Sequence, residues 1–406
     1  DSTTIYLRAG NYSVSKTLAP ASVQNLAIRA YPSETVTLSR DFDDGALFDM
    51  TEMLGLLIAD IELSTAFDFA ELIRITNCNL SALTNLKITN IDIPVSTVTS
   101  NSSIIYLNNT YTTVNFTTVD NISCPDKTLS VINCRNASFT TVKNTLIQDV
   151  TAADVTGISC NTGNLQLTTE TVEIKHLTGS IASRAVNISL AAVKTEILLD
   201  LFKISECHTG IQLSNNPVNH QEFVRIRRGE IYDCHTGIST DSGCCRFYNN
   251  VVAFCSYGLI ARLSSKIFAF NNIWFHMSDF AVPGMTAAIR SIESSEVILT
   301  YTALFENHTS FAESAGGLIL RQEFVRFINP QFEDAAARKF TLLDESPLID
   351  IGLPVDYPIN GAAVDLGKYD RDRLIPIEEI ESLTAKLLTR TYRPQLFGSP
   401  DVQALL

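Results

Sequence analysis

The 406-residue sequence lacks the usual signatures of several large protein classes. No CxxC pair occurs, so a zinc knuckle or a thioredoxin-type site is not expected. Phosphate-binding loops, GxSxG elbows and HExxH motifs are also missing. No apolar run approaches the ~20 residues of a membrane-spanning helix. Charged residues make up only 18% of the chain, while Ser, Thr and Asn are abundant, and this mixture favours strands and turns over helices.

Basic residues are scarce as well. The chain has 30 Lys and Arg against 44 Asp and Glu, which gives a net charge of −14. An acidic surface repels nucleic acid phosphates and anionic lipid headgroups, so we expect neither nucleic-acid binding nor a polybasic membrane contact. No signal peptide is visible, and the strand-like opening leaves room for a leader or an upstream domain before Asp1.

The most informative feature that is present is an internal repeat. Ile204–Ile211 and Ile231–Ile238 share the letters Ile-x-x-Cys-His-Thr-Gly-Ile, and Val252–Leu259 is a looser copy. A period of about 21 to 30 residues with three short β-branched runs fits one coil of a parallel β-helix. The leucine-rich-repeat consensus is absent, and helical periodicity is absent before about residue 375.

Stacked coils place equivalent letters above one another at the strand spacing of ~4.8 Å. Cys207, Cys234, Cys255 and Met277 then form one inward column, which predicts packed core thiols. Disulfide or redox roles are the alternative, although the odd total of nine cysteines prevents complete pairing within the chain.

The same alignment predicts the residues at two bends. Gly210, Gly237 and Gly258 are expected to mark the bend after each cysteine, where a positive φ costs glycine least. Asn77 and Asn133 are expected at another bend, where their side chains hydrogen-bond the next coil as an asparagine ladder.

The two ends of the repeat region resemble a known family. Thr4–Ser13 resembles the opening strand and Gly-x-Tyr turn of many pectate-lyase-like β-helices. Ile328–Asp334, Phe340–Gly352 and Val364–Tyr369 resemble, in that order, the closing motifs of secreted bacterial parallel β-helix proteins of the same superfamily. The resemblance implies an all-β protein, a right-handed single-stranded parallel β-helix of about ten or more coils.

We therefore divide the chain into three parts. A right-handed parallel β-helix is predicted over residues 1–326, its closing segment over 327–370, and a helix with an extended tail over 371–406. The helix is predicted at Ile375–Leu388 from the helical spacing of four apolar residues, which are Ile377, Ile380, Leu383 and Leu387. The last part is a candidate docking or assembly segment, and a frayed terminus is the alternative.

The resemblance also implies polysaccharide chemistry, because β-helix enzymes of this superfamily mostly cut or modify polysaccharides. Glycoside hydrolysis needs two carboxylates. The repeat places Glu206 directly below Asp233, where each carboxylate would raise the pKa of the other, so these two are the tentative catalytic pair. The four sequence motifs typical of polygalacturonases do not occur as a set.

A ligand-binding face is predicted beside this pair from its basic residues, which are Arg225, Arg227, Arg228, His208 and His235. The same register pairs Asp200 with Arg227 and Lys203 with Glu230, so a structural ladder of opposite charges is the alternative. No cofactor is predicted, with calcium, which pectate lyases bind, as the one alternative.

Three minor predictions concern other side chains. Tyr232 and Trp274 are candidates to stack on sugar rings. No metal site is predicted, because His176 and His276 share a column but lie several coils apart. Candidate glycosylation sites are the sequons at Asn79, Asn101, Asn108, Asn115, Asn121, Asn136, Asn187 and Asn307.

Two functions fit these observations. The first is a non-catalytic, extracellular or surface-displayed β-helix protein with a structural, adhesive or assembly role on a cell surface, in a filament or in a virion appendage. The alternative is a polysaccharide lyase or glycoside hydrolase acting on acidic or surface glycans. Self-association is expected from the flat faces and exposed strand edges of such a solenoid, and a glycan is the expected ligand.

Overall fold

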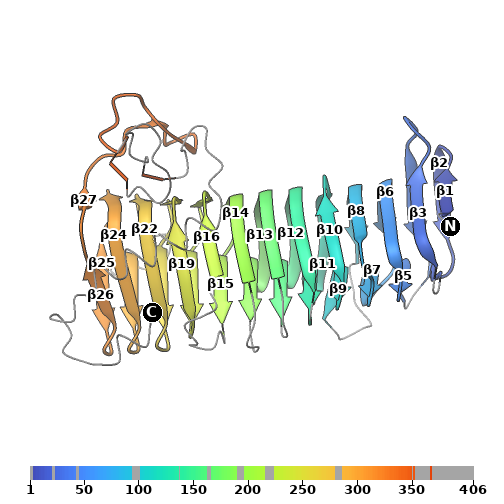
Figure 1. Cartoon of the computed structure of the whole chain (residues 1–406), viewed down its shortest axis with the longest axis horizontal. Helices are drawn as coiled ribbons and strands as arrows, with labels where there is room; N and C mark the ends of the chain where they lie inside the picture. The colour runs from blue at the N-terminus through green and yellow to red at the C-terminus, as the bar shows by residue number, and fades with distance from the viewer. Residues whose placement is uncertain are drawn as a thin grey trace.

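A computed structural model describes residues 3–20, 23–42, 45–93, 101–136, 138–161, 166–189, 196–214, 224–278, 286–349, 351–352 and 366–367. Within these ranges the chain is an all-β parallel solenoid of about 11 turns and contains no helix. The coils stack along one long axis, with the N-terminal coil at one end (Figure 1). The predicted parallel β-helix is therefore confirmed.

The strands of the first half are β1 Thr3–Leu7, β2 Gly10–Val14, β3 Gln24–Ala30, β4 Val36–Arg40, β5 Phe48–Thr51, β6 Leu54–Thr65, β7 Glu71–Thr76, β8 Ser81–Asp92, β9 Ser102–Asn108, β10 Tyr111–Asn115, β11 Thr118–Arg135, β12 Phe139–Asn161 and β13 Gln166–Ser189. Those of the second half are β14 Glu196–Ser205, β15 Thr209–Ser214, β16 Val224–Arg227, β17 Glu230–Tyr232, β18 Thr236–Asp241, β19 Cys244–Tyr248, β20 Val251–Ala253, β21 Tyr257–Arg262, β22 Lys266–Phe275, β23 Ala287–Ile292, β24 Glu296–Phe305, β25 Phe311–Ser314, β26 Leu318–Arg321, β27 Val325–Phe327, β28 Phe332–Asp334 and β29 Lys339–Leu342.

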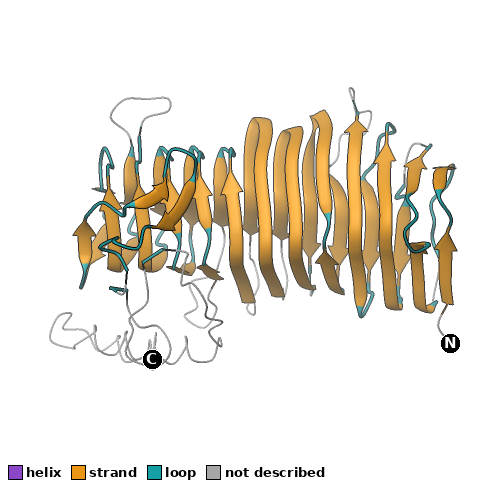
Figure 2. Ribbon diagram, turned by 90° about the horizontal axis from the view of Figure 1, so that it is seen from above, coloured by secondary structure: helices purple, strands orange, loops and turns teal. Residues whose placement is uncertain are grey.

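The strands β1 to β27 pair in parallel with strands of neighbouring coils, so they lie side by side along the long axis (Figure 2). The repeat seen in the sequence is the structural register, since Ile204 pairs with Ile231, and Ile231 with Val252. Inward positions alternate with outward ones, and the inward apolar side chains form one continuous core from Leu26 to Ile319. This core holds the solenoid together.

The cysteine column lies inside the solenoid as predicted. Cys207, Cys234, Cys255 and Met277 are all buried in the core, and the amide of His235 donates to the carbonyl of Cys207 across one coil spacing. All nine cysteines are described and buried, and no disulfide joins any of them. Burial raises the pKa of the Cys255 thiol well above its ordinary value, so these thiols pack as small apolar groups.

The glycines of the repeat do not occupy the bends, so that prediction is wrong. Gly210 lies within β15 and has no positive φ, and a Cβ atom there would stand 2.5 Å from the carbonyl oxygen of Gly237 in the next coil. This column of residues needs glycine because the backbones of neighbouring coils approach each other closely there. The bends themselves carry Glu206 and Asp233, whose φ angles are 54° and 52°.

The asparagine ladder exists but only partly where predicted. Asn77 has a φ of 53° and its Oδ1 accepts a hydrogen bond from Nδ2 of Asn109 at 2.8 Å. Asn133 instead lies within β11, where it pairs with Tyr106 and donates to Oγ of Ser103 at 3.0 Å. The motif around Asn133 resembles the motif around Asn77, but the two motifs are out of register by three residues. Cys134 pairs with Leu107, and Leu107 pairs with Ile75, so Cys134 is aligned with Ile75 and not with Cys78.

The chain after β27 folds back against the side of the coils. The antiparallel hairpin β28–β29 lies over β17, β20 and β22, where Phe340 and Leu342 join a second core with Tyr232, Val251 and Ile273. The predicted helix and tail over 371–406 lie outside the described residues, so the division at residue 370 stays a proposal.

Candidate functional site

The predicted catalytic pair is brought together, but one member is engaged elsewhere. Ser205 pairs with Tyr232, so Glu206 and Asp233 occupy neighbouring bends, as predicted. Arg338, from the turn between β28 and β29, donates from Nε and Nη2 to the two Asp233 oxygens, both at 2.7 Å. The Arg338 guanidinium also lies 3.7 Å from the ring centre of Phe254. Asp233 therefore anchors the folded-back segment, and the catalytic role of Glu206 and Asp233 stays a prediction.

The two predicted histidines form a stacked pair. The rings of His208 and His235 lie 4.7 Å apart at 12°, and His235 meets Tyr257 edge to face. Burial, and then the charge of His208, lower the pKa of His235 below its ordinary 6.5. His235 is thus held neutral near pH 7, while the stacked His208 is exposed.

The three predicted arginines belong to a ladder of opposite charges. Arg227 donates to Asp200 at 2.8 Å, Arg228 binds the same carboxylate, and Arg225 pairs with Glu196 at 2.8 Å. The side chains of Arg225 and Arg227 are 8% and 7% exposed. The predicted ligand-binding role stays a prediction, while the structural alternative has direct support in these contacts.

The two aromatic candidates cannot stack on a sugar in this arrangement. Trp274 is fully buried in the main core, and Tyr232 is 7% exposed and packs on Phe340. Among the sequons, the amide of Asn307 is occupied by the backbone of Met277 and Trp274. Asn79, Asn101, Asn121 and Asn136 are exposed.

An open polar cleft lies elsewhere, over the N-terminal coils. It has a volume of about 410 Å³ and is bounded by the turn 31–35, which follows β3, and by the middle parts of β6 and β8. Its lining combines an aromatic side chain, basic groups, carboxylates and an amide, namely Tyr31, Arg29, Lys87, Glu34, Asp60, Glu62 and Asn85. Successive coils supply these residues, because Ala59 pairs with Thr84 and Ile61 with Leu86.

Every carboxylate of the cleft has a basic partner. Asp60 accepts from Arg29 at 2.7 Å and from Asn85 at 3.0 Å. Glu62 accepts from Lys87 at 2.9 Å and from Thr89 at 3.0 Å. The hydrogen bond from Lys87 is the main cause that lowers the pKa of Glu62, so this carboxyl is ionised at neutral pH.

The aromatic wall of the cleft is partly open. Tyr31 is 44% exposed, and the Arg8 guanidinium, which is paired with Glu34 at 2.6 Å, lies 4.5 Å from its ring centre. An exposed ring beside paired donors and acceptors is an arrangement that can bind a sugar by stacking and hydrogen bonding. Sequence reasoning missed this site because no motif connects its residues. The only indication in the sequence was that Asp60 and Asn85 are separated by the length of one coil.

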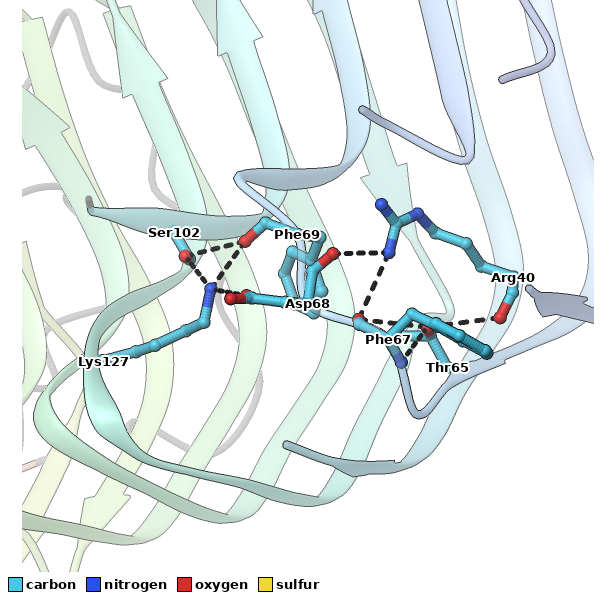
Figure 3. Close-up of polar contacts among 7 residues, drawn as sticks. All are labelled: Arg40, Thr65, Phe67, Asp68, Phe69, Ser102 and Lys127. Atoms are coloured by element: carbon cyan, nitrogen blue, oxygen red, sulfur yellow. Dashed lines mark hydrogen bonds and ion pairs between the residues drawn. The ribbon is translucent and has the colours of Figure 1, made fainter. Parts of the chain in front are cut away.

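A second cluster of charges is closed to ligands (Figure 3). Nζ of Lys127 contacts the carboxylate of Asp68 and donates to the carbonyl of Phe69 at 2.8 Å and to Oγ of Ser102 at 2.9 Å. Arg40 donates to the carbonyl of Asp68 at 2.7 Å. The Lys127 and Asp68 side chains are 1% and 7% exposed, so the cluster pins the link between β6 and β7 and cannot meet a polymer.

The described ranges lack two further features. No group of three or more His, Cys, Asp or Glu side chains is placed there to hold a metal ion. No helix long and apolar enough to cross a membrane occurs there either. The calcium expectation is untested.

Comparison with known proteins finds similarity at the level of structure alone. No protein-family model and no curated protein matches the sequence. The fold is similar to the catalytic domain of a GH87 alpha-1,3-glucanase variant in complex with tetrasaccharides, with a TM-score of 0.53 and 10% identity over 80% of this chain and 65% of that one. The complex of that domain with nigerose gives a TM-score of 0.50 and 11% identity over 80% and 64%. The A-module of a mannuronan C-5 epimerase from Azotobacter vinelandii has a TM-score of 0.39 and 9% identity over 81% and 90%.

These similarities correct the first functional prediction. The chain spans about two thirds of the glucanase domains, and identities near 10% establish the shared β-helix fold. The hypothesis of a non-catalytic surface protein is contradicted, because the similar solved structures are catalytic domains of enzymes that act on carbohydrates.

Proposed function

We propose that this chain is a carbohydrate-active β-helix protein that binds a polysaccharide in the cleft of its N-terminal coils and modifies it there. The observation that carries this proposal is the cleft itself, an open polar hollow of about 410 Å³ with an exposed tyrosine at its wall. The fold shared with a glucanase catalytic domain that was solved with tetrasaccharides supports it.

The charges of the cleft favour a particular class of glycan. Its lining holds two basic side chains, Arg29 and Lys87, and three acidic ones, Glu34, Asp60 and Glu62. Paired charges of both signs present donors and acceptors to hydroxyl groups, and the lining has no excess of basic groups to attract a polyanion. A neutral, hydroxyl-rich polysaccharide is therefore the preferred ligand, and an acidic glycan is the second candidate to test.

The chemistry proposed for the cleft uses its carboxylates. Glu62, kept ionised by Lys87, has the protonation state of a general base or nucleophile. Asp60 supplies a second carboxylate two residues earlier in the same strand. A glycoside hydrolase needs such a pair, one member to activate the attack and one to protonate the leaving oxygen. An extracellular or cell-surface location belongs to this proposal, as do self-association and a calcium ion.

The test is a polysaccharide panel with matched variants. The unaltered chain is expected to bind a neutral polysaccharide in affinity electrophoresis and to release new reducing ends, or unsaturated products in a lyase reaction. Tyr31→Ala should weaken binding by about tenfold, and Glu62→Gln should remove product while leaving binding largely in place.

The controls are residues outside the cleft. Tyr111→Ala removes a ring that is 48% exposed and stacked on Phe139, and Glu206→Gln alters the carboxylate predicted first. Both variants should behave like the unaltered chain. Binding that is equally strong in Tyr31→Ala, or activity that Glu206→Gln abolishes, would move the site out of the cleft, and no binding across the panel would overturn the proposal.

A further inference from the structure

A row of bend residues that enters the cleft continues one coil beyond it. Asp60 and Asn85 both line the cleft, and Nδ2 of Asn85 donates to Asp60 at 3.0 Å from one coil to the next. In β8 and β10, Thr84 pairs with Asn115, so the residues that follow them, Asn85 and Phe116, occupy equivalent positions. The strands β6, β8 and β10 follow one another along the long axis (Figure 1). We call Asp60, Asn85 and Phe116 the bend row.

Phenylalanine is an unusual residue for the last position of the bend row. The φ angles of Asp60, Asn85 and Phe116 are 61°, 51° and 49°. Asparagine and aspartate tolerate this left-handed region, whereas a bulky side chain is strained in it. The Phe116 side chain is also 56% exposed, so its own burial offsets little of the strain. An asparagine at this position would remove the strain without loss of a buried ring.

Two other phenylalanines of the described residues have a positive φ, and a contact holds each of their rings. Phe254, with a φ of 52°, packs against the Arg338 guanidinium. Phe324, with a φ of 56°, stacks on Tyr301 at 4.5 Å. Within the described ranges, no aromatic or cationic side chain makes such a contact with the ring of Phe116. This ring is therefore available to a ligand.

The two exposed rings, Tyr31 and Phe116, lie at opposite ends of the bend row. Tyr31 follows β3, and β3 pairs with β6, β6 with β8, and β8 with β10. Three spacings of ~4.8 Å separate the coil of Tyr31 from that of Phe116, about 14 Å along the axis. This span holds several sugar rings in line, because each ring of an extended glycan advances the chain by roughly one such spacing. Between the two rings, Asp60 and Asn85 offer carboxylate and amide groups to hydroxyls.

We propose that Phe116 is a second aromatic platform of the cleft. A neutral glycan then lies along the solenoid axis and stacks on Tyr31 near one end and on Phe116 near the other. This inference rests on the proposed function and adds to it the direction and the minimum length of the ligand. The face of a pyranose ring packs its C–H groups on an aromatic ring. The ligand therefore supplies the contact that Phe254 and Phe324 find within the chain.

The experiment measures affinity by isothermal titration calorimetry. The probes are hexasaccharides from neutral glucans, mannans, xylans and galactans. Phe116→Asn should weaken binding of the hexasaccharide by about tenfold, as should Tyr31→Ala. Because asparagine suits the left-handed backbone, Phe116→Asn should also unfold at a urea concentration no lower than the unaltered chain does. Phe116→Tyr keeps the ring and should retain the affinity.

The matched control is Phe324→Asn, which makes the same change at another bend, in a ring that is 44% exposed. It should leave the affinity unchanged. Full affinity in Phe116→Asn, together with weakened binding in Tyr31→Ala, overturns the second platform and leaves the proposed function standing. A lack of binding of every probe to the unaltered chain overturns both.

A second variant decides the case in which Phe116→Asn unfolds. Phe116→Leu keeps an apolar side chain but lacks the flat ring, and it should also weaken binding of the hexasaccharide by about tenfold. Full affinity in this variant overturns the platform.

Discussion

The coils up to β13 and the coils from β14 onward share one interior but differ in their outer rows. In the first group the sheet that carries Thr141, Lys143 and Glu170 presents half-buried polar side chains, and the bends carry asparagine ladders. In the second group the same sheet presents a buried surface of aromatic, aliphatic and arginine side chains. Inward rows therefore set the fold, while outward rows decide what each stretch of the solenoid contacts. The open cleft lies in the first group, and the folded-back hairpin covers part of the second.

The largest expected effect compares a buried ion pair with the open cleft inside the first group. Lys127→Met leaves the buried carboxylate of Asp68 without its cation and should lower the free energy of unfolding by about 3 to 5 kcal/mol. Lys87→Met breaks the half-exposed pair with Glu62 and should cost about 1 kcal/mol or less. Urea unfolding of both variants measures the difference. Similar costs would show that the interior pair is as replaceable as a surface one.

The next effect bears directly on the outer rows. Phe270→Ala removes an outward ring that is 2% exposed and should cost about 3 kcal/mol, as in a core. Tyr111→Ala removes an outward ring that is 48% exposed, in the first group, and should cost less than about 1 kcal/mol. Thermal or urea unfolding compares the two. A small cost for Phe270→Ala would contradict the burial of this ring.

The interior could be predicted from the sequence because it repeats. The match between Ile204 and Ile231 fixed the register of the cysteine column, since both segments carry the same letters at the same offset. The residues at the bends were harder to predict from the sequence. Glu206 and Asp233 adopt the positive φ there, while the glycines allow close contacts between backbones. Asn133 was misplaced because coil lengths vary, and a short motif does not reveal a slip of three residues.

The sites were less predictable than the rows because they join distant or unrepeated residues. Asp233 looked like one of two stacked carboxylates, but its partner Arg338 is more than a hundred residues away, in a segment with no repeat. The cleft residues Asp60, Glu62 and Lys87 carry no motif, and only the pairing of β6 with β8 brings them together. The Lys127–Asp68 pair was equally hidden, because a lysine in a strand is normally expected to face water.

The smallest effect examines the face of the second group that carries the exposed His208 and the half-buried His235. Burial and the neighbouring His208 lower the pKa of His235 below 6.5, with Tyr257 at its edge and Arg290 beyond that ring. As the pH falls through about 6.5, the unfolded chain binds a proton at this imidazole before the folded chain does, so stability falls with pH. The unaltered chain should thus lose more stability between about pH 7.5 and about pH 5.5 than His235→Gln does in urea unfolding. Parallel losses would mean that this imidazole is as accessible folded as unfolded, which would place the His208–His235 face with the open coils of the first group.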